Sequence, residues 1–298
     1  MNNSAPLRPR RSALFVPGSN RRALQKATGL RTDVVILDLE DAVLPEAKAG
    51  ARTEVLAAVA RRPFGNSEVV VRINGLDTEW GMADLRAAAA SGADGVLLSK
   101  VDASATLLAA ARVLDELGAP PALRLWSMAE TPRGVLDVES VTRSTPRLGV
   151  LVMGTADLGK ALRVPEQPGR AGLVPALAHC VLAARAAGLD ILDGVYMHLA
   201  DPAGFRAECI QGRHLGFDGK TLIHPGQIDA CNEIFGVSDS EAAIAAELIA
   251  AWESAAATGA GVAVHAGRLV ERLHVDDARR QLALHQTIRH HALPVRPA

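Results

Sequence analysis

Short apolar runs alternate with helical patterns along most of the chain. Between residues 13 and 223 there are eight such runs, and nearly all are followed by a segment with helical spacing. The runs are ALFV (13–16), VVILDL (34–39), VVVRI (69–73), GVLLS (95–99), LRLWSM (123–128), LGVLVM (148–153), ILDGVYM (191–197) and LGFDGKTLI (215–223). The helical segments lie near 19–28, 46–61, 78–91, 103–117, 132–140, 174–187 and 202–214, with a turn near 226–235. Runs that are apolar throughout are typical of strands buried on both faces.

This alternation predicts the fold. A regular strand–helix repeat implies parallel strands joined by right-handed crossovers. Eight such units point to an α/β protein with a closed (β/α)8 TIM barrel. The alternative is an open doubly wound sheet, but no GxGxxG follows the first run. The PGSN turn at 17–20 is by itself only a weak signal for anion binding.

The segment after the barrel has its own pattern. SDSEAAIAAELIAAWESAAA (238–257) predicts a helix capped at Ser238 or Asp239, and 259–270 predicts a loop with two short strands. Residues 275–291 predict a last helix with acids at its start and bases at its end. We therefore expect three parts: a disordered N-terminal tail (1–11), a barrel (12–235) and a C-terminal helical extension that serves as lid and oligomer contact (236–298).

Composition narrows the class of protein. With 49% apolar and 22% charged residues, the 298-residue chain can bury a sizeable core. A net charge of −1 argues against a dedicated nucleic-acid or membrane-surface binder. The three cysteines have neither CxxC spacing nor an even count, so neither a disulfide framework nor a zinc site is expected. The polar N-terminus has no secretory h-region and no apolar run spans a membrane, which predicts a soluble cytoplasmic protein.

Charged and polar residues follow the predicted strands. In a TIM barrel the active site lies at the carboxyl ends of the strands, so these residues would meet at one mouth. In order along the chain they are Asp38, Glu40 and Asp41, then Arg72 and Asn74, Lys100, Glu130, Asp157, Tyr196 and His198, and His224.

Glu130 and Asp157 follow neighbouring predicted strands. Their carboxylates would converge, and two carboxylates facing one space repel unless a proton or a cation joins them. Mg²⁺ commonly takes one or two protein carboxylates and leaves positions for water and substrate. Both acids also stand at helix starts, where a carboxylate stabilises the helix. The spacing leaves both interpretations open.

The remaining charges allow pairing or catalysis. Arg72 either pairs with a neighbouring acid or binds a substrate carboxylate through its two-pronged guanidinium. Asp38, Glu40 and Asp41 either form ion pairs with Arg72 and Lys100, or one of them orients a metal-bound water. Lys100 is an electrostatic partner rather than the amine of a Schiff base.

Two histidines have weaker functional signals. His224 in IHPGQI and His198 in YMHLAD are interpreted first as hydrogen-bonded structural residues and second as catalytic ones. No GxSxG elbow and no Ser/His/Asp grouping is found, so hydrolysis by a serine nucleophile has little support.

Several motifs in a fixed order carry a family resemblance. They are RSALFVPGSN (11–20), DVVILDLEDAV (33–43), VVVRINGLDTEWG (69–81), GADGVLLSKV (92–101), MAETPRGV (128–135), MGTADLGKAL (153–162), GVYMHLADPAGFRAE (194–208) and GFDGKTLIHPGQID (216–229). With them the chain resembles the citrate lyase beta-subunit-like proteins of the HpcH/HpaI aldolase superfamily, which includes the malyl-CoA lyases.

The resemblance implies a barrel with a C-terminal extension, assembled as a homotrimer or hexamer. It implies Mg²⁺ held by Glu130 and Asp157, and a 2-oxo or 2-hydroxy acid held by Arg72. It also implies a CoA thioester as a substrate, and an acid/base group contributed by the extension of a neighbouring subunit. Glu271 stands at the position of that group.

This chain departs from the family pattern at four positions. Glu271 replaces the usual aspartate, and Leu273 stands where proline is common. Ser99 replaces the proline of LPK, and His198 replaces an acidic or amide residue. The change at Glu271 bears on the activity and that at His198 bears on the substrate.

From these residues and the resemblance we expect a Mg²⁺-dependent carbon–carbon lyase. It would cleave or form a hydroxy-diacid thioester such as malyl-CoA or citramalyl-CoA through an acetyl-thioester enolate, with glyoxylate or a 2-oxo acid as the other partner. The alternatives are a (3S)-malyl-CoA-type thioesterase, a class II aldolase acting without CoA, and a non-catalytic binding protein. The expected site residues are Arg72, Glu271, Glu40 and Asp41 for catalysis, Arg72, Glu130 and Lys100 for substrate binding, and Glu130 and Asp157 for the metal.

Overall fold

The computed structural model describes residues 7–291, and the chain forms two compact units. One unit is Arg10–Ile234. The other contains the segment from Phe235 onward together with residues 7–9. None of the helices in the described part is both long enough and apolar enough to cross a membrane.

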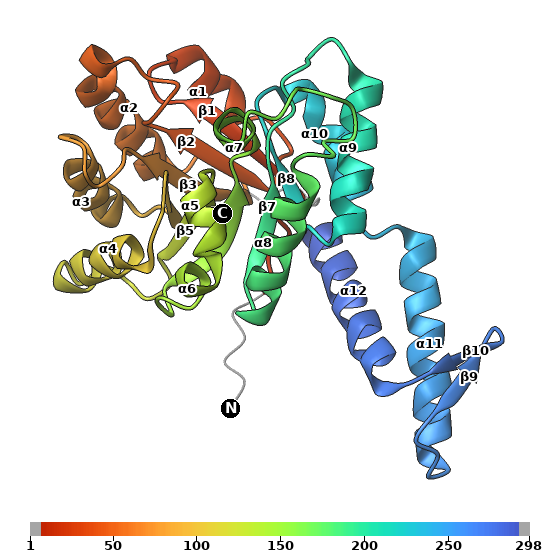
Figure 1. Ribbon diagram of the computed structural model, residues 1–298. Helices are drawn as coiled ribbons and strands as arrows, with labels where there is room; N and C mark the ends of the chain where they lie inside the picture. Colours follow the sequence, from red (N-terminus) through yellow and green to blue (C-terminus); the bar gives the residue numbers. More distant parts are fainter. Residues whose placement is uncertain (1–6, 292–298) are drawn as a thin grey trace. The chain divides into compact units, whose positions relative to one another are not determined.

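The first unit is a closed barrel of eight parallel strands (Figure 1). The strands are β1 (Ser12–Pro17), β2 (Val34–Asp38), β3 (Glu68–Ile73), β4 (Gly95–Leu98), β5 (Arg124–Ala129), β6 (Leu148–Met153), β7 (Asp190–Asp193) and β8 (Gly219–Leu222). Each strand pairs with its sequence neighbours, and β1 also pairs with β8, which closes the ring. The predicted (β/α)8 barrel is confirmed.

Helices surround the strands on the outside of the barrel (Figure 1). They are α1 (Arg21–Ala27), α2 (Lys48–Arg61), α3 (Gly81–Ser91), α4 (Ser104–Glu116), α5 (Pro132–Leu136), α6 (Val138–Thr142), α7 (Thr155–Ala161), α8 (Val174–Ala186), α9 (Pro202–Leu215) and α10 (Ile228–Ile234), with short 3-10 helices η1 (Pro45–Ala47) and η2 (Pro225–Gln227). The helix expected near 132–140 is divided in two at Asp137, and the turn expected near 226–235 is η2 followed by α10.

Two strands are shorter than their apolar runs. The run 191–197 gives only β7, because the chain leaves the barrel wall after Asp193. The run 215–223 gives only β8, because Gly216 takes a left-handed conformation that ends α9 and the next residues form the connection. Apolar residues in these two loops are thus no evidence of strand.

The barrel interior is filled by side chains that alternate along each strand. They form one buried cluster: Ala13, Val34, Ile36, Val70, Leu97, Trp126, Met128, Val150, Val152 and Leu192, with Phe15 packed against it. At the amino end of the strands, the Arg10 guanidinium lies 5.3 Å from the centre of the Trp126 ring. Arg10 also makes ion pairs with Glu68 and Asp190. Apolar packing and this ion-paired arginine together close that end of the barrel.

The predicted disordered tail (1–11) only partly overlaps the described chain. Residues 1–6 lie outside the described residues. Arg10 is held by Glu68 and Asp190, and Arg11 donates to both oxygens of Asp33 at 2.8 Å. These pairs tie the two residues before β1 to the barrel.

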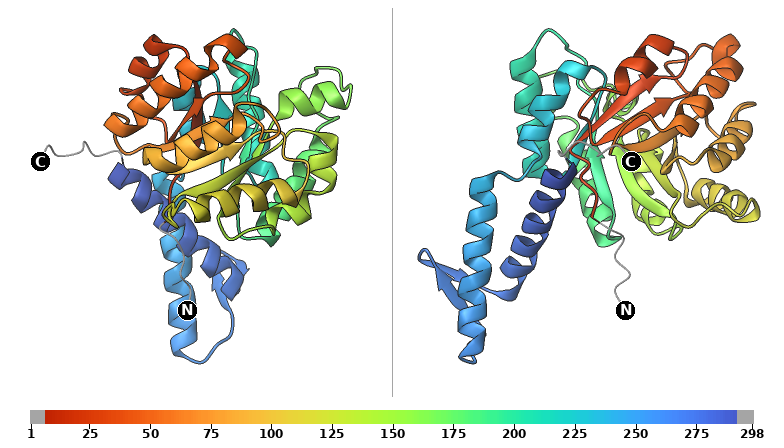
Figure 2. Two further views of the ribbon diagram at one scale, coloured as in Figure 1. Left: turned by 90° about the vertical axis from the view of Figure 1, so that its left-hand side faces the viewer. Right: turned by 180° about the vertical axis from the view of Figure 1, so that it is seen from behind.

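The second unit contains α11 (Asp239–Ala257), a hairpin of β9 (Ala263–His265) and β10 (Arg268–Val270), and α12 (Arg272–His291). Figure 2 shows the two long blue helices, α11 and α12, running side by side. Ser238 caps α11 in a capping box with Glu241, as the sequence predicts. Ala263, Val270 and Val275 pack against α11 residues such as Trp252 to form a small core.

Candidate active site

Because side chains alternate between the two faces of a strand, three charged residues lie on the inward face at the mouth of the barrel. Ile36 on β2, Val70 on β3 and Met128 on β5 belong to the interior cluster. Residues two positions further along share that face, and these are Asp38, Arg72 and Glu130. All three are buried. The barrel therefore brings together three residues that are far apart in the sequence.

Arg72 is held by the acids around it. Its Nε and Nη2 each donate to Asp38 at 2.6 Å, which is a two-pronged pair. Its Nη1 lies 3.1 Å from Glu40. The guanidinium also lies 4.8 Å from the centre of the Phe15 ring. Burial opposes its charge, but these carboxylates raise the pKa of Arg72, so it stays protonated. Only Nη1 is not committed to Asp38.

Glu40, Asp41 and Lys100 form a second charged group beside Arg72. Lys100 Nζ donates to Glu40 Oε1 at 2.5 Å and to Asp41 Oδ1 at 3.4 Å. Burial raises the pKa of Glu40, and its hydrogen bond with Asp41 adds to this. Burial acts in the same sense on Asp41, but the Glu40 hydrogen bond and the charges of Arg72 and Lys100 lower its pKa on balance. Of the two acids, the half-exposed Asp41 is the one that is ionised more readily.

Lys100 also positions Glu130 through its backbone. Its φ of 52° is in the left-handed region, which is uncommon for a residue with a side chain. In that conformation its N–H donates to Glu130 Oε1 at 2.5 Å, while its ammonium reaches Glu40. One residue thus connects the Glu40–Asp41 pair with Glu130.

Glu130 is a buried acid with a raised pKa. Its side chain is 2% exposed and it lies directly after β5. Burial is the largest cause that raises its pKa to about 7, and the charges of Glu40 and Asp157 add to it. The exposed Asp157 carboxylate therefore lies close enough to Glu130 for its charge to act on that carboxyl group. Asp157 lies in the first turn of α7.

These two carboxylates fit a magnesium ion. Neither Glu130 nor Asp157 makes an ion pair with any described residue. A buried carboxylate with a raised pKa gains most from a cation, and Mg²⁺ needs no more than one or two protein carboxylates. Within residues 7–291 no three His, Cys, Asp or Glu side chains gather as a metal group, so the donor set does not favour zinc.

The raised pKa of Glu130 predicts a pH dependence of stability in the metal-free protein. The folded chain holds a proton on Glu130 up to a pKa of about 7, whereas the unfolded chain releases it near 4.5. Between those values the folded state binds more protons, so the free energy of unfolding should fall as the pH rises from 4.5 to 7.

Urea denaturation in EDTA, compared between the wild type and Glu130→Gln across this pH range, measures the effect. The stability advantage of Glu130→Gln should grow with pH and level off above 7. A difference that does not change with pH would contradict the assignment.

The two histidines and Tyr196 lie in loops at the strand ends. His224 Nδ1 accepts from the Gly226 N–H and caps η2. His198 Nε2 lies 2.9 Å from Glu166, and both side chains are exposed. Tyr196 donates to Asp201 at 2.7 Å, which raises the Tyr196 pKa to about 12. Among residues 7–291, none of these groups makes a hydrogen bond or ion pair with Arg72 or Glu130.

Glu271 belongs to the second unit. It is exposed and directly precedes α12. Its N–H donates to His274 Nδ1 at 3.0 Å, and its carbonyl accepts from the His274 N–H at the same distance. These local contacts leave the carboxylate of Glu271 unused.

Several site residues were missed in the sequence. Phe15 and Met128 flank Arg72, with Met128 Sδ 3.9 Å from Nη1. Lys48 is buried and donates to the carbonyls of Leu39 and Glu40, which fixes the loop after β2. Phe15 and Met128 could have been identified from their positions, because both lie near the ends of apolar runs, two positions after residues that face the barrel interior.

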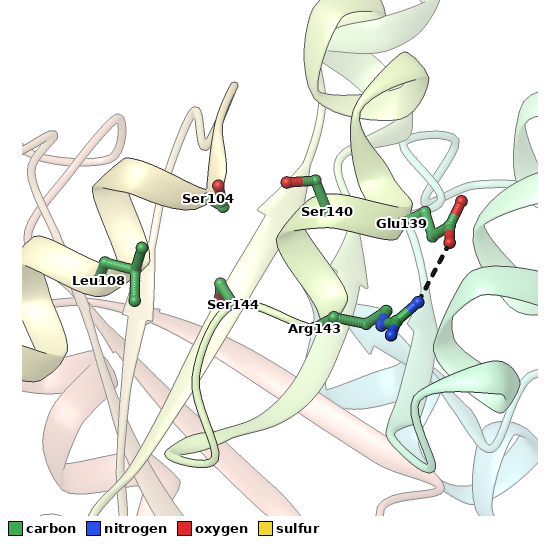
Figure 3. Close-up of a pocket in the computed structure, with 6 residues that line it drawn as sticks. All are labelled: Ser104, Leu108, Glu139, Ser140, Arg143 and Ser144. Carbon is green, nitrogen blue, oxygen red and sulfur yellow. Dashed lines mark hydrogen bonds and ion pairs between the residues drawn. The ribbon is translucent and has the colours of Figure 1, made fainter.

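A cavity of about 440 Å³ lies away from these residues, between α4 and α6. Figure 3 shows Ser104, Leu108, Ser140 and Ser144 around it, with the exposed Glu139–Arg143 pair at one side. It contains none of the predicted site residues. The cysteines Cys180, Cys209 and Cys231 are buried and reduced.

Comparison with known proteins identifies the family of this chain. A model of the HpcH/HpaI aldolase/citrate lyase family matches residues 11–225. The chain belongs to that family. The family is one of enzymes, and the match covers the barrel strands from β1 to β8 with their mouth residues.

Three relatives bear on activity and ligands. The chain is 46% identical to the (3S)-malyl-CoA thioesterase of Cereibacter sphaeroides, over 94% of this chain and 96% of that one. It is 34% identical to citrate lyase subunit beta of Escherichia coli K12, over 91% and 92%. The crystal structure of CitE from Mycobacterium tuberculosis in complex with magnesium, acetoacetate and coenzyme A superposes with a TM-score of 0.73 at 27% identity, over 92% of this chain and 97% of that one.

These relatives correct the expected reaction. The sequence predicted a carbon–carbon lyase first and a malyl-CoA-type thioesterase as an alternative. The 46% identical relative is named a thioesterase, whereas the relative named as a citrate lyase subunit is only 34% identical. The lyase prediction is wrong on this comparison. The motifs could not separate the two reactions, because both begin with the same binding of a hydroxy-acid thioester.

Proposed function

We propose that this chain hydrolyses the CoA thioester of a short hydroxy-dicarboxylic acid of the malyl type, giving CoA and the free diacid. One observation carries the proposal: the buried Glu130, beside Asp157, Arg72 and Lys100, lies in a chain 46% identical to a (3S)-malyl-CoA thioesterase. Such a mouth suits an acyl group that carries its own carboxylate and hydroxyl.

Glu130 and Asp157 would hold Mg²⁺ in this proposal. Support comes from the chemistry of the pair and from the magnesium in the CitE complex. When bound, Mg²⁺ supplies a Lewis acid that polarises substrate oxygens. Lys100 contributes by donating its N–H to Glu130 Oε1, which leaves Oε2 free of that bond.

Arg72 and Lys100 would bind the carboxylate end of the acyl group. Arg72 is anchored by Asp38 and presents Nη1, and Lys100 presents a half-exposed ammonium. The guanidinium is already oriented before substrate arrives, so little conformational freedom is lost on binding. The acyl carboxylate would take the place of weaker contacts between these cations and Asp41.

Asp41 is the acid best suited to accept a proton from the attacking water. Glu40 is buried and both its oxygens are engaged, by Lys100 at Oε1 and by the Asp41 N–H at Oε2. Asp41 is half exposed and has a lowered pKa, and its carboxylate lies 3.4 Å from Lys100 and 3.8 Å from Arg72, besides its hydrogen bond with Glu40. The water oxygen bonds to the thioester carbon, its proton goes to Asp41, and the C–S bond then breaks. The departing thiolate needs no strong acid, since thiols ionise near pH 8.5.

The role of Glu271 stays a prediction. In the family resemblance its position supplies an acid/base group to a neighbouring subunit's site. Hydrolysis does not need a proton at the acetyl carbon, whereas carbon–carbon cleavage does. The loss of the usual aspartate is therefore compatible with a hydrolase.

Incubating the full chain with (3S)-malyl-CoA and Mg²⁺ tests the function. Free thiol measured with a disulfide reagent and malate measured by chromatography should appear in equal amounts. Glyoxylate and acetyl-CoA, measured in the same samples, should be absent. Equal amounts of acetyl-CoA and glyoxylate without free thiol would overturn the proposal.

A further inference from the structure

Two glycines occupy inward-facing positions at the barrel mouth. On β6, Val150 and Val152 face the interior, and the next position of that parity is Gly154. On β7, Leu192 faces the interior, and the next such position is Gly194. Both glycines are buried. At the equivalent positions of β2, β3 and β5 stand charged residues, so something other than chemistry by a side chain explains the glycines.

Gly194 lies against the start of the helix that carries Asp157. A Cβ atom on Gly194 would lie 2.6 Å from Thr155 Cγ2 and 2.8 Å from Thr155 Cβ, and closer still to Oγ1. Thr155 is the first residue of α7, is 7% exposed, and stands two positions before Asp157. The first turn of α7 can reach its place only because residue 194 has no side chain.

Gly154 leaves space in the same way on the other side of that turn, next to Glu130. A Cβ atom there would lie 2.7 Å from Glu130 Oε2 and closer still to Glu130 Cβ. The Gly154 N–H also donates to the Ala129 carbonyl at 3.0 Å, which ties it to the end of β5. The segment Gly154–Thr155 is therefore enclosed between Glu130 and Gly194.

Gly194 is itself fixed by a buried charge network. Its N–H donates to Asp193 Oδ1 at 2.8 Å. The Asp193 carboxylate is fully buried and accepts from Arg170 Nη1 at 2.7 Å and from Lys220 Nζ at 3.0 Å. A peptide held in this way gives α7 a rigid surface to rest on.

We propose that Gly194 is a positioning residue that sets where the Asp157 carboxylate stands relative to Glu130. This rests on the proposed function only in taking Glu130 and Asp157 as the ligands of Mg²⁺. Non-bonded carbons approach to about 3.5–4.0 Å, so a methyl group on residue 194 displaces α7 by about 1 Å. Mg²⁺ binds oxygens at about 2.0–2.1 Å in strict octahedral geometry, whereas Ca²⁺ accepts about 2.3–2.6 Å and irregular geometry.

Gly194→Ala tests the proposal by metal binding to the full chain without substrate. Titration calorimetry with Mg²⁺ and with Ca²⁺, well below the unfolding midpoint, should show Mg²⁺ affinity reduced at least tenfold and Ca²⁺ affinity reduced less. The matched control is Gly159→Ala, also in α7, where the added Cβ meets only Leu173 Cδ1 at 3.9 Å. That variant should bind both ions as the wild type does.

Relief of the clash gives a second measurement. Thr155→Gly removes the atoms that meet residue 194, so Gly194→Ala/Thr155→Gly should recover most of the Mg²⁺ affinity. If Gly194→Ala does not fold, Thr155→Ala is the alternative variant. It removes part of the Thr155 side chain that packs against Gly194, and it should weaken Mg²⁺ binding several-fold.

The outcomes separate the inference from the proposed function. A folded Gly194→Ala with wild-type affinities for both ions overturns the positioning role, as does an equal loss for Mg²⁺ and Ca²⁺ that the double variant does not restore. Wild-type Mg²⁺ binding by Glu130→Ala would instead show that the ligand pair in the proposed function is wrong.

Discussion

Glu130→Gln should lower the Mg²⁺-dependent release of CoA from a malyl-type thioester by about a thousandfold. Lewis-acid stabilisation of developing charge supplies several kcal/mol, and each 1.4 kcal/mol is about a factor of ten in rate. The amide is nearly the same size as the carboxylate, but it carries no charge. Because Glu130 is buried and accepts the Lys100 N–H, the substitution keeps the packing and removes the ligand.

Initial rates of thiol release at saturating Mg²⁺ measure this effect. Glu139→Gln is the control, because Glu139 on α6 is 76% exposed and its ion pair is with Arg143, the residue that follows that helix. It should keep the wild-type rate. A Glu130→Gln enzyme with more than a tenth of the wild-type rate would exclude Glu130 from the metal site.

Lys220→Met should lower the free energy of unfolding by about 3–5 kcal/mol, the usual effect of removing one partner of a buried ion pair. Lys220 is fully buried, and its ammonium lies 3.0 Å from Asp193 and 2.7 Å from Glu208. Without it, two carboxylates share the one remaining cation, Arg170. The apolar replacement fits the space but leaves excess negative charge in the barrel wall.

Urea denaturation followed by circular dichroism measures the change. Lys26→Met is the control, because Lys26 is exposed on α1, and its free energy of unfolding should stay within about 0.5 kcal/mol of the wild type. Burial opposes ionisation of Asp193, but Lys220 and Arg170 lower its pKa below the ordinary value near 3.8. The stabilisation from this pair is therefore present above that pH and is lost as the pH falls below it. Equal midpoints for the two variants would contradict the network's role.

The apolar runs were enough to predict the barrel, because strands buried on both faces need continuous apolar sequence. They predicted strands that were too long where the following loop is also apolar, as after Asp193. The run 215–223 predicted β8 but not the burial of its charged residue Lys220, which depends on partners from β7 and α9. A charged residue in a buried strand can be recognised only when its counter-ions are in view.

The sequence predicted which charged residues lie at the strand ends and offered ion pairs of Arg72 and Lys100 with Asp38, Glu40 and Asp41 as one interpretation, but it did not give the geometry of those pairs. The catalytic and metal-binding roles of these residues stay predictions. Arg72, Glu130 and Lys100 were selected because they lie at the end of an apolar run or just after one. That Arg72 is bound to Asp38 through two nitrogens, or that the Lys100 backbone reaches Glu130, depends on the register between strands and on one left-handed residue. The sequence analysis did not select Gly154 and Gly194, because a glycine in a sequence usually indicates a turn. In this fold they matter because the absence of a side chain leaves room for Glu130 and Thr155.

The closed amino end of the barrel determines how a ligand can enter and leave the site. Packed side chains fill the barrel interior, and Arg10 lies over Trp126 at its amino end, so a molecule bound next to Arg72 enters and leaves through the mouth. If the proposed function holds, an acyl group bound there by its carboxylate would enter ahead of its coenzyme and lie deeper in the mouth. On the proposed hydrolysis, the coenzyme half would therefore leave first, and the hydroxy acid between Arg72 and Lys100 would leave last.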